Sequence, residues 1–251
     1  MISKRLSFAA IAVSLALCSF VSAATIVDFK PLPISPTVPE FKFDRALGAG
    51  IPVFRHDVGA VGNNDGTLPV VNQTPGGLLV ETPFIIPGIP GSQFAAASTL
   101  FFDSSLIFTG GLQANGPAIN AGGVLIQQLT PGSFQLFSTG PAPTLLLSGF
   151  MSSASFIVGV GDAGSVFSSQ DVNYTGGAIY NALVAAGGST SGNSMSISMT
   201  DITPGLNIAR DGYLADFNAN ATGLFNANVV PEPTSLTLLA IAMGSLLLRR
   251  R

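Results

Sequence analysis

The chain has few of the residues that enzymes and metal sites use most. Its 251 residues include one cysteine, one histidine, three tyrosines and no tryptophan. A zinc site built from several histidines or cysteines is therefore excluded, because such sites need three or four of these ligands. A single cysteine also excludes an internal disulfide, so packing and hydrogen bonds must stabilise the fold.

Charged residues are scarce as well, at 9% of the chain, while glycine and proline number 29 and 17. From about Gly66 onward, short apolar runs alternate with turn residues, which is typical of many short strands. We therefore predict an all-β fold, a sandwich of jelly-roll type, with residues 66–228 as its body. The expected strands cover residues 78–86, 98–108, 123–129, 133–137, 144–150 and 155–160.

Two later segments show the period-two alternation of a strand with one buried face. In residues 194–200, Met195, Ile197 and Met199 share one face, and the serines share the other. Residues 213–222 alternate in a similar way, and Asn226-Ala227-Asn228 is expected to connect this strand to the tail.

Residues 178–186 are the best candidate for a helix in the body. They are rich in alanine and end at Gly187-Gly188, a suitable helix stop. Their apolar positions do not distinguish a helix from a strand, so a strand is the alternative.

The first 23 residues have the three parts of a secretory signal peptide. Lys4 and Arg5 precede an apolar helix-forming run from Leu6 to Val21, and small residues lead to a cleavage site after Ala23. Lipoprotein processing at Cys18 is the alternative, although the leucine before it is larger than that motif usually allows. Cleavage after Ala23 would also remove the only cysteine.

Residues 24–65 contain a dense proline run at positions 31, 33, 36 and 39. Prolines cannot donate the hydrogen bonds of a central strand. We therefore predict an extended arm along the outside of the sheet, docked by Phe41, Phe43 and Phe54. A free linker is the alternative.

The C-terminal tail, residues 229–251, has three parts in a fixed order. Pro231, Glu232 and Pro233 hold the chain extended, an uncharged apolar run follows from Leu236 to Leu248, and Arg249, Arg250 and Arg251 end the chain. The run predicts a short transmembrane helix, with the arginines on the cytoplasmic side. Its 13 residues would span only about 20 Å, against roughly 30 Å for a hydrocarbon core.

This tail resembles the PEP-CTERM sorting signal of Gram-negative bacteria. The resemblance covers the tail alone and rests on Pro231-Glu232-Pro233, the apolar run and the terminal arginines. It implies transient anchoring in the inner membrane and cleavage near Pro231 to Pro233 by an exosortase-type membrane protease. It also implies delivery to the cell surface or extracellular matrix, often together with exopolysaccharide. An ordinary C-terminal membrane anchor is the alternative.

Removing both terminal segments leaves five basic and twelve acidic residues, a net charge of about −7. This balance argues against nucleic acid as a partner, because binding phosphates requires clustered lysine and arginine. It also argues against binding to anionic lipid surfaces.

No arrangement of residues predicts catalysis. A serine hydrolase would have to use His56, and no Gly-x-Ser-x-Gly motif is present. A glycoside hydrolase needs two facing carboxylates, but no spacing selects a pair. The acids considered for such a pair are Glu40, Asp44, Glu81 and Asp103.

Oxygen-rich segments are candidates for calcium, but they are also favoured turn sequences. These segments are Asn63-Asn64-Asp65-Gly66 with the nearby Asp57, Asp171-Val172-Asn173 and Asp211-Gly212. We interpret all of them as turns. The Asn-x-Thr matches at Asn72, Asn173 and Asn220 are expected by chance in this composition.

The sequence thus predicts an exported, non-enzymatic protein of the surface or matrix, without a cofactor. Its expected partners are an exosortase-type protease and the inner membrane, with extracellular polysaccharide as a further candidate. A carbohydrate-binding module is the first alternative, and it would need exposed Tyr174, Tyr180 or Tyr213 in line with polar side chains. A secreted hydrolase is the second.

Overall fold

The computed structural model describes residues 22–31, 41–44, 54–56, 78–84, 100–138, 143–161 and 164–229. The predicted signal helix and the transmembrane helix of the tail therefore lie outside the described residues. So do Pro231, Glu232, Pro233 and the three terminal arginines. Within the ranges above, no helix is long and apolar enough to cross a membrane.

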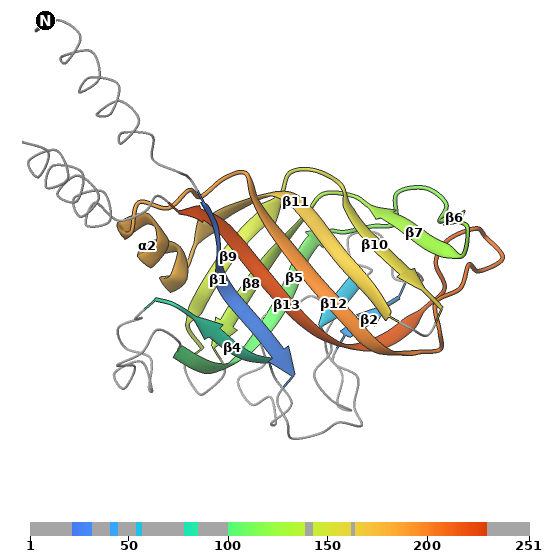
Figure 1. Ribbon diagram of the computed structural model, residues 1–251, viewed down its shortest axis with the longest axis horizontal. Helices are drawn as coiled ribbons and strands as arrows, with labels where there is room; N and C mark the ends of the chain where they lie inside the picture. Colours follow the sequence, from blue (N-terminus) through green and yellow to red (C-terminus); the bar gives the residue numbers. More distant parts are fainter. Residues whose placement is uncertain are drawn as a thin grey trace, which may run out of the picture.

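Nearly all regular structure in these ranges is β-strand (Figure 1). The strands are β1 Ser22–Pro31, β2 Phe41–Phe43, β3 Phe54–His56, β4 Leu78–Thr82, β5 Leu100–Gly111, β6 Ile119–Ala121, β7 Val124–Leu129, β8 Gly132–Ser138, β9 Leu145–Met151, β10 Ser155–Val160, β11 Gly164–Gly176, β12 Asn193–Thr203 and β13 Phe217–Val229. The helix α2, Ala178–Ala185, matches the predicted helix to within one residue.

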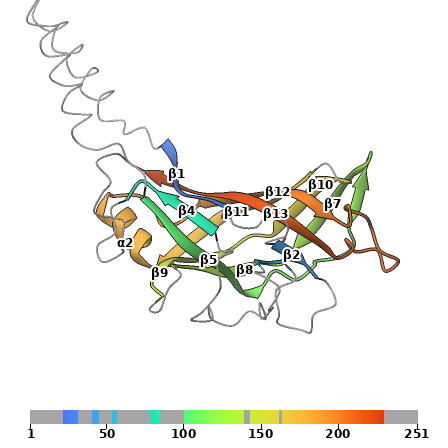
Figure 2. The same cartoon turned by 90° about the horizontal axis from the view of Figure 1, so that it is seen from below.

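Eight strands form a closed antiparallel ring in the order β1, β4, β5, β8, β9, β11, β12 and β13. β12 pairs with both β11 and β13, and β13 pairs with β1, which completes the ring. β2 and β3 continue from β13, while β10, β7 and β6 continue from β11. In Figure 2 the ring is flattened, with β1, β12 and β13 in one layer above β5 and β8. An all-β, sandwich-like fold is thereby confirmed, whereas the jelly-roll type is not.

Phenylalanine side chains fill the space between the layers. Phe54 stacks on Phe167 with ring centroids 5.0 Å apart, and Phe134 lies 5.1 Å from Phe225. Phe41, Phe43 and Phe54 are fully buried, as their predicted docking role required. Aromatic contacts of this kind contribute beyond the area that they bury, so they help a chain without disulfides to remain stable.

Parts of the predicted arm are strands of the same sheet. β1 lies inside the ring between β13 and β4, and Ile26, Val27 and Phe29 are buried. The prediction of an arm outside the sheet missed this strand, which ends at Pro31, the first proline of the run. Residues 32–40, with the remaining prolines, lie outside the described residues.

The alternating segments were predicted with mixed success. In β12 the side chains of Met195, Ile197 and Met199 are buried as expected. The next strand begins at Phe217 rather than Tyr213, because the preceding residues form a turn closed by pairing of Ile208 with Leu214.

The prediction that Asn226-Ala227-Asn228 is a connector is wrong, because these residues continue β13. Their partners on β1 are Thr25, Ala24 and Ala23, and Ala227 is buried. The inward alternation of β13 therefore continues to Asn228.

Candidate functional site

The predicted signal-cleavage residue Ala23 lies in β1, opposite Asn228 of β13. Ser22 pairs with Val229 in the same ladder. The chain therefore enters and leaves the described fold on neighbouring strands, at one end of the molecule. The residues of the sorting motif follow Val229 and lie outside the described residues.

The candidate acids are not brought together into a described site. Glu81 forms an ion pair with Lys30 at 2.9 Å, and Asp44 forms one with Lys42 at 3.5 Å. The structure describes only the backbone of Asp103, which pairs with Leu79. Glu40 lies outside the described residues. Asp44 and Glu81 thus each have a lysine partner.

His56 is placed by its backbone alone, which pairs with Phe41 at the end of the β3–β2 ladder. Among the residues that the structure describes, no group of three or more histidine, cysteine, aspartate or glutamate side chains could hold a metal ion.

Of the described oxygen-rich segments, Asp211-Gly212 lies in a turn as predicted, whereas the turn predicted at Asp171-Val172-Asn173 is wrong because these residues belong to β11. Asp171, at φ 61°, sits where β11 bulges against β12, and its carbonyl accepts a hydrogen bond from the Ser152 amide. The Asp211 carboxylate accepts a hydrogen bond from the Tyr213 amide at 3.3 Å, as in an Asx turn. The segment Asn63 to Gly66 and Asp57 lie outside the described residues.

Tyr174 cannot serve as an exposed sugar platform, because its side chain is 3% exposed. Its hydroxyl donates a hydrogen bond of 2.8 Å to the Asn226 carbonyl, and burial raises the pKa of this phenol. Tyr180 lies on α2 and Tyr213 in the β12–β13 connection, at opposite ends of the sheet in Figure 1. Of the three tyrosines that a carbohydrate module could have used, burial thus removes Tyr174.

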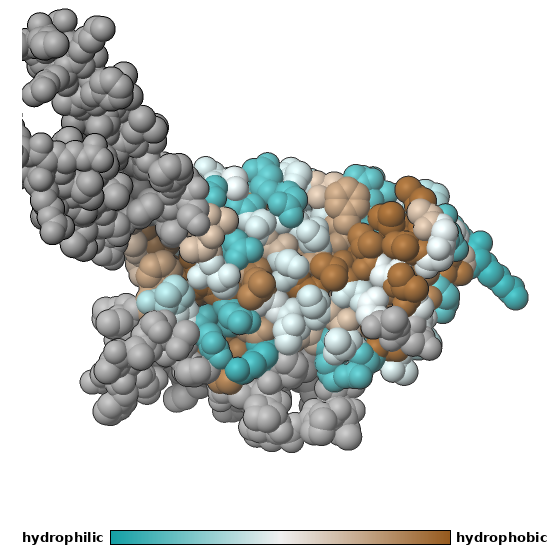
Figure 3. Space-filling view, in the orientation of Figure 1, coloured by the Kyte–Doolittle hydropathy of each residue, from teal (hydrophilic) through white to brown (hydrophobic). Residues whose placement is uncertain are grey.

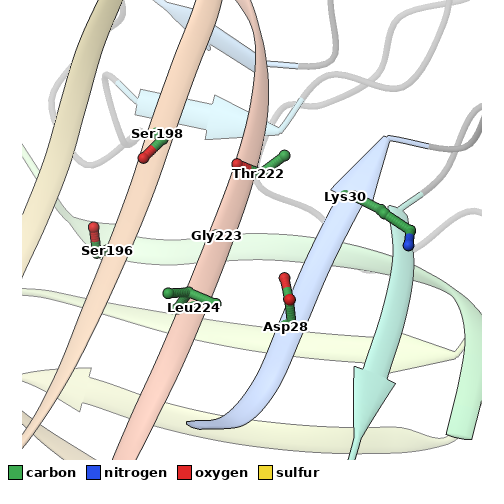
Figure 4. Close-up of a pocket in the computed structure, with 7 residues that line it drawn as sticks. All are labelled: Asp28, Lys30, Ser196, Ser198, Thr222, Gly223 and Leu224. Carbon is green, nitrogen blue, oxygen red and sulfur yellow. The ribbon is translucent and has the colours of Figure 1, made fainter. Parts of the chain in front are cut away.

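A polar depression of about 340 Å³ lies instead on the outer face of β12, β13 and β1 (Figure 4). Its lining residues are Asp28, Lys30, Ser196, Ser198, Thr222, Gly223 and Leu224. The strand register produces it, because Leu224 pairs with Ser196 on one side and with Asp28 on the other. The sequence signal for it was the run of outward-facing serines in residues 194–198, which has no meaning until neighbouring strands are known.

The three hydroxyls of the polar depression are available to a ligand, whereas the Lys30 ammonium group is bonded to Glu81. No described group is hydrogen-bonded to the hydroxyls of Ser196, Ser198 or Thr222. Partial burial raises the pKa of the Asp28 carboxyl, repulsion from Glu81 raises it further, and Lys30 opposes both. With hydroxyls, one carboxylate and one ammonium group, the polar depression can exchange hydrogen bonds with a polyol, but no described base activates its serines.

A second surface feature is an apolar patch on the outer face of β6, β10 and β11. Ile119 is 60% exposed, and Phe156, Val160 and Val166 are also exposed. In Figure 3, apolar atoms gather toward the end of the molecule where Figure 1 places β6, β7 and β10. The register contributes, since Val158 pairs with both Val166 and Ile126.

Comparison with known proteins identifies no relative. No protein-family model matches the chain, and neither a curated protein nor a solved structure matches it.

Proposed function

We propose that the protein is an exported, non-enzymatic component of the cell surface or extracellular matrix, sorted by an exosortase-type system. The observation that carries this proposal is the tail, in which Pro231-Glu232-Pro233 precedes a short apolar run and three terminal arginines. The signal-peptide pattern of residues 1–23 supports the same route.

The position of the chain ends supports the proposal further. Ser22 and Val229 are partners in the β1–β13 ladder, so both flanking segments join the fold at the same end. The signal-peptide segment and the C-terminal tail therefore leave the folded body at one end, so both can reach the same membrane surface without any change in the sheet. In this proposal the apolar run holds the body at the inner membrane until an exosortase-type protease cuts near Pro231 to Pro233.

The test is replacement of Pro231, Glu232 and Pro233 by alanine in the full chain, in its native host. We expect the variant to stay in the membrane fraction with its terminal arginines, while the wild-type chain is recovered from the surface or medium without them. Mass spectrometry of the C-terminus measures the difference. An unchanged C-terminus and location in the variant would refute the proposal.

A second candidate function, polysaccharide binding, is favoured by the polar depression. Its free hydroxyls lie on the adjacent strands β12 and β13, and Leu224 supplies an apolar contact for a sugar ring. Without an aromatic platform, we expect weak binding to neutral polymers, because Asp28 and the net negative charge repel anionic ones.

Affinity electrophoresis in gels that contain host exopolysaccharide tests this second function. Thr222→Arg should fill the polar depression and abolish the retardation, while the exposed Thr200→Arg on the neighbouring strand controls for the added charge. Equal retardation of both variants and the wild type would rule out the polar depression as the binding site.

A further inference from the structure

The last residues of β13 are hydrogen-bonded on both edges of the strand. On one edge, Ala227 and Val229 lie in the ladder with β1, opposite Ala24 and Ser22. On the other edge the ladder with β12 ends at the pair Asn226 and Ser194. The last three residues of β13 therefore lie beyond the ladder on that side.

A loop continues the missing ladder. The Asn228 amide donates to the Asn193 side-chain oxygen at 3.2 Å, and the Asn228 carbonyl accepts from the Ser189 amide at 2.7 Å. The Asn193 side-chain amide also donates to the Ser189 carbonyl at 3.1 Å, which fixes the loop in this position. Asn193 is 4% exposed, so the oxygen and the nitrogen of its side-chain amide are buried, and both are hydrogen-bonded.

Tyr174 anchors the same region from inside the ring. Its hydroxyl donates to the Asn226 carbonyl at 2.8 Å, while its backbone amide donates to the Thr190 carbonyl at 2.7 Å. One residue of β11 therefore holds both the end of β13 and the loop beside it.

We propose that Tyr174, Ser189 and Asn193 form a C-terminal clamp that fixes the point at which proteolysis from the C-terminal side stops. A protease takes up several residues of its substrate in extended form, so a strand paired on both edges must first unfold locally. The C-terminal clamp raises the free energy of that opening for residues 226–229. The body then keeps all of β13 after any cut beyond Val229.

The biological meaning of the C-terminal clamp rests on the proposed function. If an exosortase-type enzyme cuts near Pro231, the C-terminal clamp lets the mature chain end beyond β13 and protects the ring from trimming. The physical claim can be tested with an unrelated protease, so its failure and the failure of the sorting proposal are distinguishable.

The experiment digests the purified full chain in detergent with a broad-specificity protease and determines the mass of the resistant fragment. The variants are Asn193→Ala, Asn193→Asp and Tyr174→Phe. Asn220→Ala is the matched control, because it removes a β13 side chain bonded to Asp201 without touching the C-terminal clamp. Hydrogen exchange of the Asn228 amide is measured on the same samples.

We expect the wild-type and Asn220→Ala fragments to end at Val229 or beyond. Asn193→Ala should be trimmed into β13, with Asn228 exchange faster by about tenfold or more. Asn193→Asp keeps the acceptor for the Asn228 amide. Its trimming and its Asn228 exchange rate should therefore lie between those of the wild type and those of Asn193→Ala. If Asn193→Ala fails to fold, Tyr174→Phe replaces it in the test, and we expect the same trimming into β13 and faster Asn228 exchange.

Two results would overturn the proposal. One is a wild-type fragment that already ends inside residues 224–228. The other is a folded clamp variant whose fragment end and Asn228 exchange equal those of the wild type.

Discussion

Tyr174→Phe is the substitution that separates one buried hydrogen bond from the packing around it. The phenol ring packs edge-on against Phe134 with centroids 6.4 Å apart, and phenylalanine preserves that contact. Only the hydroxyl and its 2.8 Å bond to the Asn226 carbonyl are lost. A buried neutral hydrogen bond contributes about 1 kcal/mol, and the unsatisfied carbonyl can bring the cost to about 2 kcal/mol. For a chain of this size, we expect the melting temperature at pH 7 to fall by about 2–8 °C.

The same residue predicts a dependence on alkaline pH. Burial raises the pKa of Tyr174 in the folded state far above that of the unfolded chain, which is about 10. Its contribution to stability is therefore complete below pH 10 and is lost above it, by about 1.4 kcal/mol per pH unit. Tyr174→Phe lacks this loss, so the difference from the wild type should shrink at pH 11.

Thermal unfolding followed by circular dichroism at pH 7 and pH 11 measures both effects. Tyr180→Phe is the control at pH 7, because no described group is hydrogen-bonded to the Tyr180 hydroxyl, and we expect a change below about 0.5 kcal/mol. The reasoning is refuted if Tyr174→Phe is as stable as the wild type at pH 7, or if its loss of stability is equally large at pH 11.

Two further predictions concern the wall formed by β13 and β1. Asp28→Asn should stabilise the fold at pH 7, because it removes repulsion from Glu81 across the β1–β4 ladder. The pKa of Asp28 is raised in the folded state, so acid protonates the wild-type carboxyl and removes the same repulsion. The stability difference between Asp28→Asn and the wild type should therefore disappear as pH falls, and a difference that grows in acid would contradict this prediction. Gly223→Ala should cost about 1–3 kcal/mol, because a Cβ atom would lie 2.2 Å from the Phe29 ring. Ser196→Ala, on the outer face, should be nearly neutral in the same melts, and equal melting temperatures for the two variants would contradict this prediction.

Local patterns were sufficient to predict the elements whose two faces differ in polarity. β12 alternates buried methionines with solvent-facing serines, so the period was visible in the sequence. α2 was predicted from its alanines and the glycines that end it. Both are decided by neighbours a few residues away.

Elements defined by distant partners were missed. β1 is interior because β13 pairs with it, and the hydrogen-bonded Thr25 and Asn226 side chains are 201 residues apart. β11 was missed because the serines Ser165 and Ser169 occupy buried positions and break its apolar alternation.

The surface sites required register as well. The polar depression exists because Asp28, Leu224 and Ser196 are lateral neighbours on three strands. The C-terminal clamp exists because Asn193 lies beside Asn228, which the sequence analysis placed in a connector. Neither juxtaposition has a signature within a single segment of sequence.

The pairing of β1 with β13 determines how late in synthesis the fold can be completed. Until the ribosome has synthesised β13, the N-terminal half of β1 lacks the partner strand that the structure describes for it, and the ring cannot close around the hydrophobic interior. Contacts of such long sequence separation form slowly. The ring therefore closes late in folding, and under the proposed export route this delay would help to keep the chain unfolded until it has crossed the membrane.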